Sequence, residues 1–150
     1  AIVYPNLNLT LIDSLNKRIK FIKETCDVLD IKNVDAIHSR AEDIDRNKDY
    51  REKFDICVSR AVANLASLSE YCLPLVKVGG SFVSYKSKGY EVEIAEAQKA
   101  IKVLGGETVN IEKFELGEYG ERILLDIKKI KSTPNKYPRK AGLPTKEPIK

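Results

Sequence analysis

The chain has 150 residues, 43% of them hydrophobic, and a formal net charge of +4. This length can bury one hydrophobic core but leaves little room for a second domain. The charge is uneven, because residues 128–150 hold eight Lys or Arg against one acid, Glu147, and the rest of the chain sums to about −3. Such a basic tail is typical of a polyanion-binding protein, and a plain solvated extension fits the charge equally well.

The cysteines and the lack of targeting signals indicate the compartment. Cys26, Cys57 and Cys72 lie at apolar positions, without the spacing of a metal site. The sequence shows no signal peptide and no apolar run long enough to span a membrane. We therefore expect a cytoplasmic protein with reduced cysteines, no bound metal and no membrane partner.

The first predicted elements are a strand and an amphipathic helix. A short apolar strand over 7–13 ends in Asp13, and Ser14 stands where it would cap a helix. Apolar residues of that helix recur at spacings of four, three, four and three, which predicts one buried face formed by Leu15, Ile19, Ile22, Cys26 and Leu29.

The alternation of strands and helices continues to about residue 131. In order, the patterns predict a strand at 34–38, a loop with one helical turn at 39–44, a strand at 54–59, a helix at 65–73, a strand at 80–85, a helix at 91–104, and strands at 108–114 and 122–129. The turn at 117–120 is short enough to make the last two strands an antiparallel hairpin. The repeated Pro and Gly residues that follow predict no regular structure in the tail.

This order of elements predicts a doubly wound, mostly parallel α/β sheet that ends in an antiparallel hairpin. In such sheets ligands lie beyond the carboxyl ends of the strands, and Arg60 directly follows the strand at 54–59. Ordinary dinucleotide-binding folds continue with helices between all strands, so the hairpin counts against an NAD-linked oxidoreductase.

Six stretches of sequence carry a family resemblance. They are TLIDSLNKRIKFI (10–22), SRAE (39–42), FDICVSRAVANL (54–65), YCLPLVKVGG (71–80), ERILLDIKK (121–129) and TPNKYPRKAGLPTKEPI (133–149). Together they resemble the RsmG family, also called GidB, of 16S ribosomal RNA guanine-N(7) methyltransferases. The resemblance covers essentially the whole chain, and it implies the Rossmann-like fold of class I S-adenosylmethionine-dependent methyltransferases.

The sequence departs from that family at its beginning. The family carries a helical N-terminal region, a first strand and a glycine-rich loop around the methionine end of the cofactor, whereas this chain has no glycine before Gly79 and no methionine. The resemblance therefore implies a C-terminal fragment, with a partial methyltransferase domain at 1–131 and a basic, proline-rich tail at 132–150. Without that central strand, we expect unpaired sheet edges beside 7–13 and 54–59.

The resemblance implies that S-adenosyl-L-methionine binds at Asp13, Ser14, Ala41, Glu42 and Arg60. Asp13 would accept hydrogen bonds from the ribose hydroxyls, with Ser14 along the same edge. Ala41 and Glu42 would meet the adenine, and Arg60 would face the cofactor and the target base. From local sequence alone, Asp13 fits a helix-capping acid equally well, Glu42 a solvated loop acid, and Arg60 a residue that pairs with an acid.

The implied partner is the 16S ribosomal RNA of the small ribosomal subunit. The residues that would contact it are Arg60, Lys86, Arg122, Tyr137 and Arg139, with Lys88 extending the patch. For the tail, RNA contact and docking onto the domain remain equally open.

No catalytic residue is assigned, for a chemical reason. Guanine N(7) has a free lone pair and no proton to lose, so methyl transfer needs alignment rather than a general base. We therefore expect His38, the single histidine, to be structural. The alternative is a non-catalytic RNA-binding or structural fragment, and an NAD-linked oxidoreductase is a more distant one.

Overall fold

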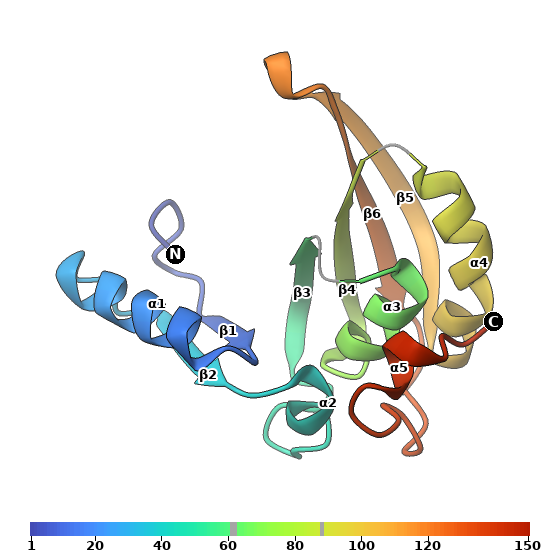
Figure 1. The fold of residues 1–150 in the computed structure, drawn as a ribbon, viewed down its shortest axis with the longest axis horizontal. Helices are drawn as coiled ribbons and strands as arrows, with labels where there is room; N and C mark the ends of the chain where they lie inside the picture. Colours follow the sequence, from blue (N-terminus) through green and yellow to red (C-terminus); the bar gives the residue numbers. More distant parts are fainter. Residues whose placement is uncertain (61–62, 88) are drawn as a thin grey trace. The chain divides into compact units, whose positions relative to one another are not determined.

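The computed structural model describes residues 1–60, 63–87 and 89–150, which form two compact units, 1–44 and 45–150 (Figure 1). The first unit is a β-α-β motif. Strands β1 (Leu9–Asp13) and β2 (Val34–His38) are parallel and paired along their whole length, with α1 (Asn16–Val28) between them in sequence. One helical turn, α2 (Ala41–Ile44), follows β2, as the sequence predicted.

The apolar face of α1 is buried only at its middle. Ile19 is 2% exposed and Ile22 and Cys26 are half-buried, whereas Leu15 and Leu29 are 52% and 56% exposed. The periodicity therefore predicted the helix correctly but overstated the buried face. The sheet of this unit has two strands among the described residues, and only the middle of α1 is buried.

The predicted cap of α1 is wrong. Leu15, not Ser14, is the N-cap residue, and its side chain caps nothing. The Asp13 carboxylate supplies the missing acceptor, because its Oδ1 takes a hydrogen bond of 2.8 Å from the backbone N–H of Leu15. Asp13 thus ends a strand and satisfies the start of a helix at the same time.

The second unit contains a four-stranded mixed sheet in the order β3-β4-β6-β5. β3 and β4 are parallel, and β6 runs antiparallel to both β4 and β5, which confirms the predicted hairpin. Its elements in chain order are β3 (Phe54–Arg60), α3 (Leu65–Cys72), β4 (Val76–Lys86), α4 (Tyr90–Val103), β5 (Gly106–Glu115), η1 (Gly117–Tyr119), β6 (Glu121–Lys129) and α5 (Leu143–Lys146).

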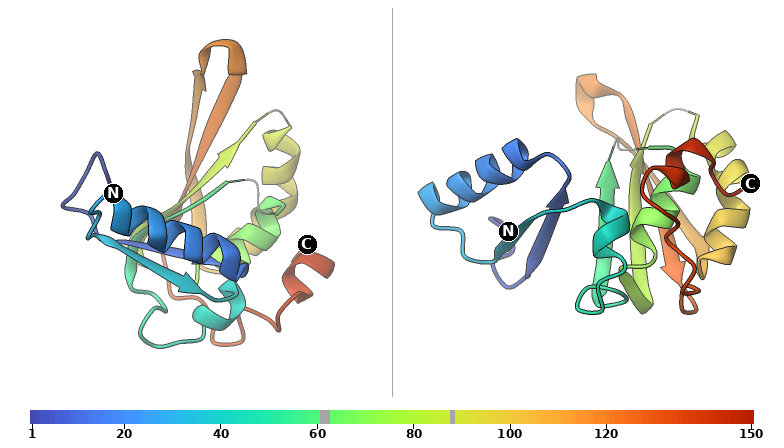
Figure 2. Two further views of the ribbon diagram at one scale, coloured as in Figure 1. Left: turned by 60° about the vertical axis from the view of Figure 1, so that its left-hand side comes forward. Right: turned by 60° about the horizontal axis from the view of Figure 1, so that its bottom comes forward.

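The core of the second unit lies between its sheet and the helices α3 and α4, which cover one face (Figure 1, Figure 2). Alternation along β6 shows this arrangement, because Ile123, Leu125 and Ile127 are fully buried while the residues between them are half-buried. On β3, by contrast, Ile56 and Val58 are both 61% exposed. The opposite face of this sheet is therefore the open one within the unit.

Four strands have an unpaired side among the described residues. β1 and β2 pair only with each other, β3 pairs only with β4, and β5 pairs only with β6. The edges of β1 and β3 are the two that the sequence led us to expect.

The prediction that the tail lacks regular structure is wrong for one helical turn. α5 begins after Gly142, whose φ of 82° suits a residue without a side chain, and it has proline at its start. The turn is held against α3, since Ser67 Oγ donates to the carbonyl of Pro144 at 2.7 Å and the hydroxyls of Tyr71 and Thr145 are 2.7 Å apart.

Candidate functional site

In the first unit the predicted cofactor residues gather at one end of the sheet. Asp13 and His38 are register partners at the carboxyl ends of β1 and β2. The N–H of Ser39 donates to the carbonyl of Asp13 at 3.2 Å, and α2 begins two residues later at Ala41. This places Asp13, Ser14 and the start of α2 where ligands bind in parallel α/β sheets.

Asp13 is an ionised acceptor with hydrogen-bonding capacity to spare. The Leu15 N–H, together with Arg18, whose Nη1 lies 3.0 Å from Oδ2, holds the pKa of this carboxyl below its usual 3.8. The side chain is 24% exposed. A carboxylate has about four lone-pair positions, so these two contacts leave acceptor sites for the two hydroxyls of a ribose.

His38 has a structural role at this edge. Its Nε2 lies 3.0 Å from the carbonyl oxygen of Ser14, an acceptor, so Nε2 is the donor. The histidine therefore links the ends of the two strands, which agrees with the structural role expected from sequence. Ser14 itself is exposed at the same edge.

Glu42 is 8% exposed and Ala41 is half-buried. So low an exposure does not fit the solvated loop acid that local sequence favoured for Glu42. An acid is rarely this buried without a structural or binding role.

In the second unit the predicted residues Arg60, Lys86 and Arg122 lie at one end of the sheet. Arg60 is the last residue of β3 rather than the residue after it, because it still pairs with Tyr85 of β4. Lys86 pairs with Ile123 of β6, next to Arg122. Arg60 is exposed and Arg122 is half-buried, with its Nη1 donating to the carbonyl of Glu121 at 2.9 Å. Lys88 lies outside the described residues.

Lys86 has a partner that the sequence analysis missed. Its Nζ lies 2.5 Å from Oε2 of Glu93 on α4, and its side chain is only 10% exposed. The same oxygen accepts the N–H of Leu65 at the start of α3. Glu93 of α4 thus links the start of α3 to the end of β4, where Lys86 is its partner. A carboxylate in the first turn of a helix was the available signal, but it does not identify a distant lysine as its partner.

The tail residues Tyr137 and Arg139 are held against the domain. The guanidinium of Arg139 forms a two-pronged ion pair with Glu70 of α3, 2.7 Å at the closest approach, and the carboxylate of Glu70 is fully buried. Glu70 is the main reason that the pKa of Arg139 is raised. Of the two interpretations left open for the tail, these contacts favour docking for Arg139, while RNA contact by Tyr137 stays a prediction.

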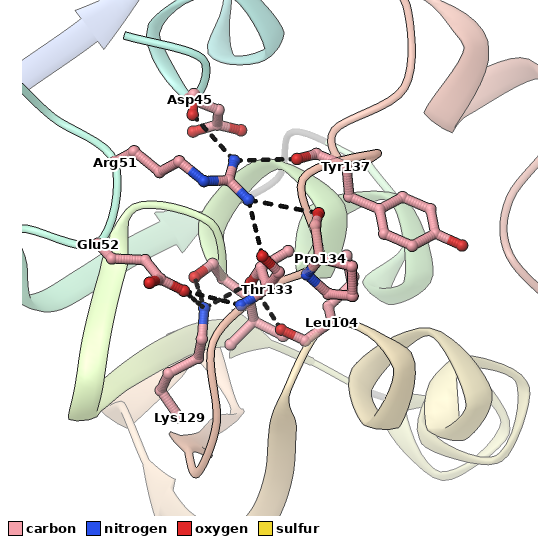
Figure 3. A network of polar contacts seen from close by, with 9 residues as sticks. Asp45, Arg51, Glu52, Leu104, Lys129, Thr133, Pro134 and Tyr137 are labelled. Carbon is pink, nitrogen blue, oxygen red and sulfur yellow. Dashed lines mark hydrogen bonds and ion pairs between the residues drawn. The ribbon is translucent and has the colours of Figure 1, made fainter. Parts of the chain in front are cut away.

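A polar network fastens the start of the tail (Figure 3). Arg51 donates to the carbonyls of Thr133, Pro134 and Tyr137 at 2.9, 3.4 and 2.9 Å. The fully buried Lys129 donates to the hydroxyl of Thr133 at 2.5 Å. Each tail carbonyl in this network therefore has a cationic donor, which is strong hydrogen bonding for an irregular segment.

Two kinds of feature are absent from the described residues, a metal-binding group and a membrane-spanning helix. Within residues 1–60, 63–87 and 89–150, no three His, Cys, Asp or Glu side chains are grouped as a metal ion would need. No described helix combines the length and apolar character of a membrane-spanning segment.

Asp13, Ala41 and Glu42 belong to one unit and Arg60 to the other, so their convergence on one pocket stays a prediction.

Comparison with known proteins gives consistent matches. The family model "rRNA small subunit methyltransferase G" (GidB) matches residues 1–124. Curated proteins with that name are 52% identical over 149 residues in Brevibacillus brevis and 56% identical over 151 residues in Alkaliphilus oremlandii. Both alignments cover 99% of this chain and 63% of the relative. The chain thus spans less than two thirds of the length of these relatives.

Solved structures share the fold at low sequence identity. A 16S rRNA adenine-N(1) methyltransferase from Catenulisporales acidiphilia matches with a TM-score of 0.69 at 10% identity, over 89% of this chain and 78% of that one. An rRNA methylase from Streptococcus thermophilus matches with a TM-score of 0.60 at 14% identity, over 85% and 78%. The fold is the Rossmann-like one of class I methyltransferases, as the sequence predicted.

Proposed function

The chain belongs to the GidB family of small-subunit rRNA methyltransferases, and we propose that the protein transfers a methyl group from S-adenosyl-L-methionine to ribosomal RNA. More specifically, we propose N(7) of a guanosine in the 16S RNA as the acceptor. The small ribosomal subunit is then its partner, and the cytoplasm its place of action.

The observation that carries this proposal is the Asp13 carboxylate at the carboxyl end of β1. It is ionised and partly exposed, and it accepts two of the about four hydrogen bonds that a carboxylate can accept. We infer that Asp13 binds the ribose of the cofactor, that Ser14 lines the same edge, and that Ala41 and Glu42 meet the adenine. Arg60 would face the reacting end from β3.

The chemistry needs little from the side chains beyond placement. The cofactor, when bound, supplies an electrophilic methyl group on a sulfonium centre. The in-plane lone pair of guanine N(7) needs no deprotonation, so the protein's task is to hold two reactants in line and exclude water. No general base is therefore required, which fits a site in which His38 Nε2 donates to the carbonyl of Ser14.

Asp13→Asn in the intact protein tests the proposed role of the carboxylate. Asparagine keeps the shape and still caps α1, but it loses the charge and half of the acceptor capacity. We expect binding of S-adenosylhomocysteine, measured by calorimetry, to weaken about 10- to 100-fold. The matched control is Asp35→Asn, an exposed acid on β2 of the same unit, which should bind like the wild type.

Three outcomes would count against the proposal. Equal affinity of Asp13→Asn and wild type would remove Asp13 from the cofactor site. An intact protein that binds RNA but no S-adenosylhomocysteine would favour the non-catalytic RNA-binding alternative. Binding of NAD in its place would favour an oxidoreductase, which family membership already argues against.

A further inference from the structure

The open face of the second sheet presents a tyrosine where β3 and β4 end. Phe82 and Ser84 of β4 are fully buried on the side that α3 and α4 cover. Because side chains alternate along a strand, Tyr85 points to the opposite, open face, and it is 43% exposed. The position is the carboxyl end of two parallel strands, where α/β sheets bind ligands.

Two arginines and a second aromatic ring lie beside this tyrosine. Arg60 is the register partner of Tyr85 on β3, and Leu124 is its partner on β6. Arg122 precedes Leu124 by two residues, so it lies on the same face and diagonal to Tyr85, a separation that long side chains span. Phe114 of β5 is the partner of Arg122 and is 38% exposed. We call Arg60, Tyr85, Phe114 and Arg122 the Tyr85 face.

The arginines of the Tyr85 face form no ion pair with any acid among the residues that the structure describes. Two acids share this face without pairing with the arginines, Glu112 across from Leu124 and Asp126 across from Val83. Lys86, on the helix side, is by contrast paired with Glu93.

We propose that Tyr85 is a stacking platform for an unpaired RNA base, with Arg60 and Arg122 binding the phosphates on its two sides. Aromatic rings stack on any base, and planar guanidinium groups match phosphate oxygens. RNA is recognised in this way where bases are unpaired and splayed out. A plain apolar partner would bury both guanidinium groups without counter-charges, whereas a polyanion neutralises them.

This inference rests on the proposed function and adds a base-positioning residue to it. Tyr85 has no place in the cofactor set, so RNA affinity and cofactor affinity separate the two proposals experimentally. The stacked base would lie at or directly beside the base that reacts, because Tyr85 neighbours Arg60.

The test compares three substitutions in the intact protein, Tyr85→Ala, Tyr85→Leu and Tyr85→Phe. The probe is a short single-stranded RNA that carries 2-aminopurine, whose fluorescence is quenched when it stacks. We expect the alanine and leucine variants to bind about 5- to 150-fold more weakly and to lose the quenching. Phenylalanine keeps the ring and should restore both. The matched control is Tyr119→Ala, a tyrosine of η1 that is 66% exposed, which should behave like wild type.

Salt dependence tests the arginines separately from the ring. Arg122→Gln should make the slope of log affinity against log salt shallower by about 0.7, the contribution of one phosphate contact with a single strand. Tyr85→Ala should leave that slope unchanged, because it removes no charge.

Three results would overturn the inference. Wild-type affinity in both Tyr85→Ala and Tyr85→Leu would show that no base stacks there. Wild-type affinity in the leucine variant alone would show that the position needs an apolar side chain rather than an aromatic ring. That result would fit a protein segment packed over Tyr85. An unchanged slope in Arg122→Gln would remove the phosphate contact. Thermal melting checks that each variant is folded, and unchanged binding of S-adenosylhomocysteine shows that the cofactor site is intact.

Discussion

At the scale of single residues, the clearest energetic feature is the buried carboxylate of Glu70. It is fully buried, and its neutralising partner is Arg139 from the far end of the sequence. A buried charge without a partner is strongly destabilising, more so than the intact pair is stabilising. The pair therefore makes the fold of the second unit depend on a residue of the tail.

We predict that Arg139→Met lowers the free energy of unfolding by about 3 kcal/mol, because the Glu70 carboxylate loses its counter-charge. Urea unfolding measures the effect. Lys140→Met is the matched control, since Lys140 is exposed, and it should change stability by no more than about 0.5 kcal/mol. Equal stability of both variants would show that the ion pair contributes nothing.

Glu52 gives a pH dependence with a definite sign. Burial raises the pKa of its carboxyl, but the N–H of Thr133 and the Lys129 ammonium outweigh this and leave the pKa below 4.5. The unfolded chain therefore takes up this proton before the folded one does. The stabilisation is fully present above pH 4.5 and is lost as the pH falls through the lower folded value.

We accordingly predict that Glu52→Gln is less stable than wild type at neutral pH and loses less stability on acidification. Denaturant unfolding from about pH 6 down to about pH 3 measures this. A variant with the same acid slope as wild type would exclude Glu52 as a source of it.

Sequence indicated Asp13 but not Glu70 or Glu93, for a simple reason. Asp13 acts within its own strand-helix junction, where capping rules apply over two residues. Glu70 and Glu93 act on partners contributed by other elements, Arg139 and Lys86. Helical periodicity shows that such acids lie in a helix and gives no partner.

At the scale of elements, the tail is a docked segment rather than a free extension. Arg51 donates to three carbonyls of the tail, and α5 is held against α3. Charge counting alone left this open, because most of the attachment uses backbone groups that composition does not reveal.

We predict that Arg51→Met loosens this attachment. Trypsin should cleave the tail faster at the exposed Lys136, and the unfolding free energy should fall by about 1–3 kcal/mol, as expected for lost hydrogen bonds to a charged donor. Lys48→Met, an exposed change nearby in sequence, should leave the cleavage rate as it was. Equal cleavage rates in both variants would contradict the attachment.

The predicted strands and helices were right in type, and their boundaries moved where tertiary pairing extends them. β4 begins at Val76, four residues before its predicted start at Gly80. Gly79 has a φ of +90°, and the pairing register shifts between Phe54 and Ile56. A bulge of this kind continues a strand through glycines that sequence rules treat as a turn.

At the scale of the whole molecule, the alternation of elements was enough to predict parallel strands followed by an antiparallel hairpin. The structure has the parallel pairs β1-β2 and β3-β4, in two sheets, and the antiparallel pairs β4-β6 and β6-β5. The alternation of elements did not predict the Tyr85 face. It depends on the register of β3, β4, β5 and β6 together, which no single stretch of sequence encodes.

Methyl transfer by the intact protein tests the proposed activity itself. Small ribosomal subunits that lack the modification are incubated with S-adenosylmethionine carrying a labelled methyl group, and the 16S RNA nucleosides are then analysed by mass spectrometry. We predict label in 7-methylguanosine, at a rate that Asp13→Asn reduces and Asp35→Asn does not. Label on another base or another atom, or no transfer by the folded wild-type protein, would contradict it.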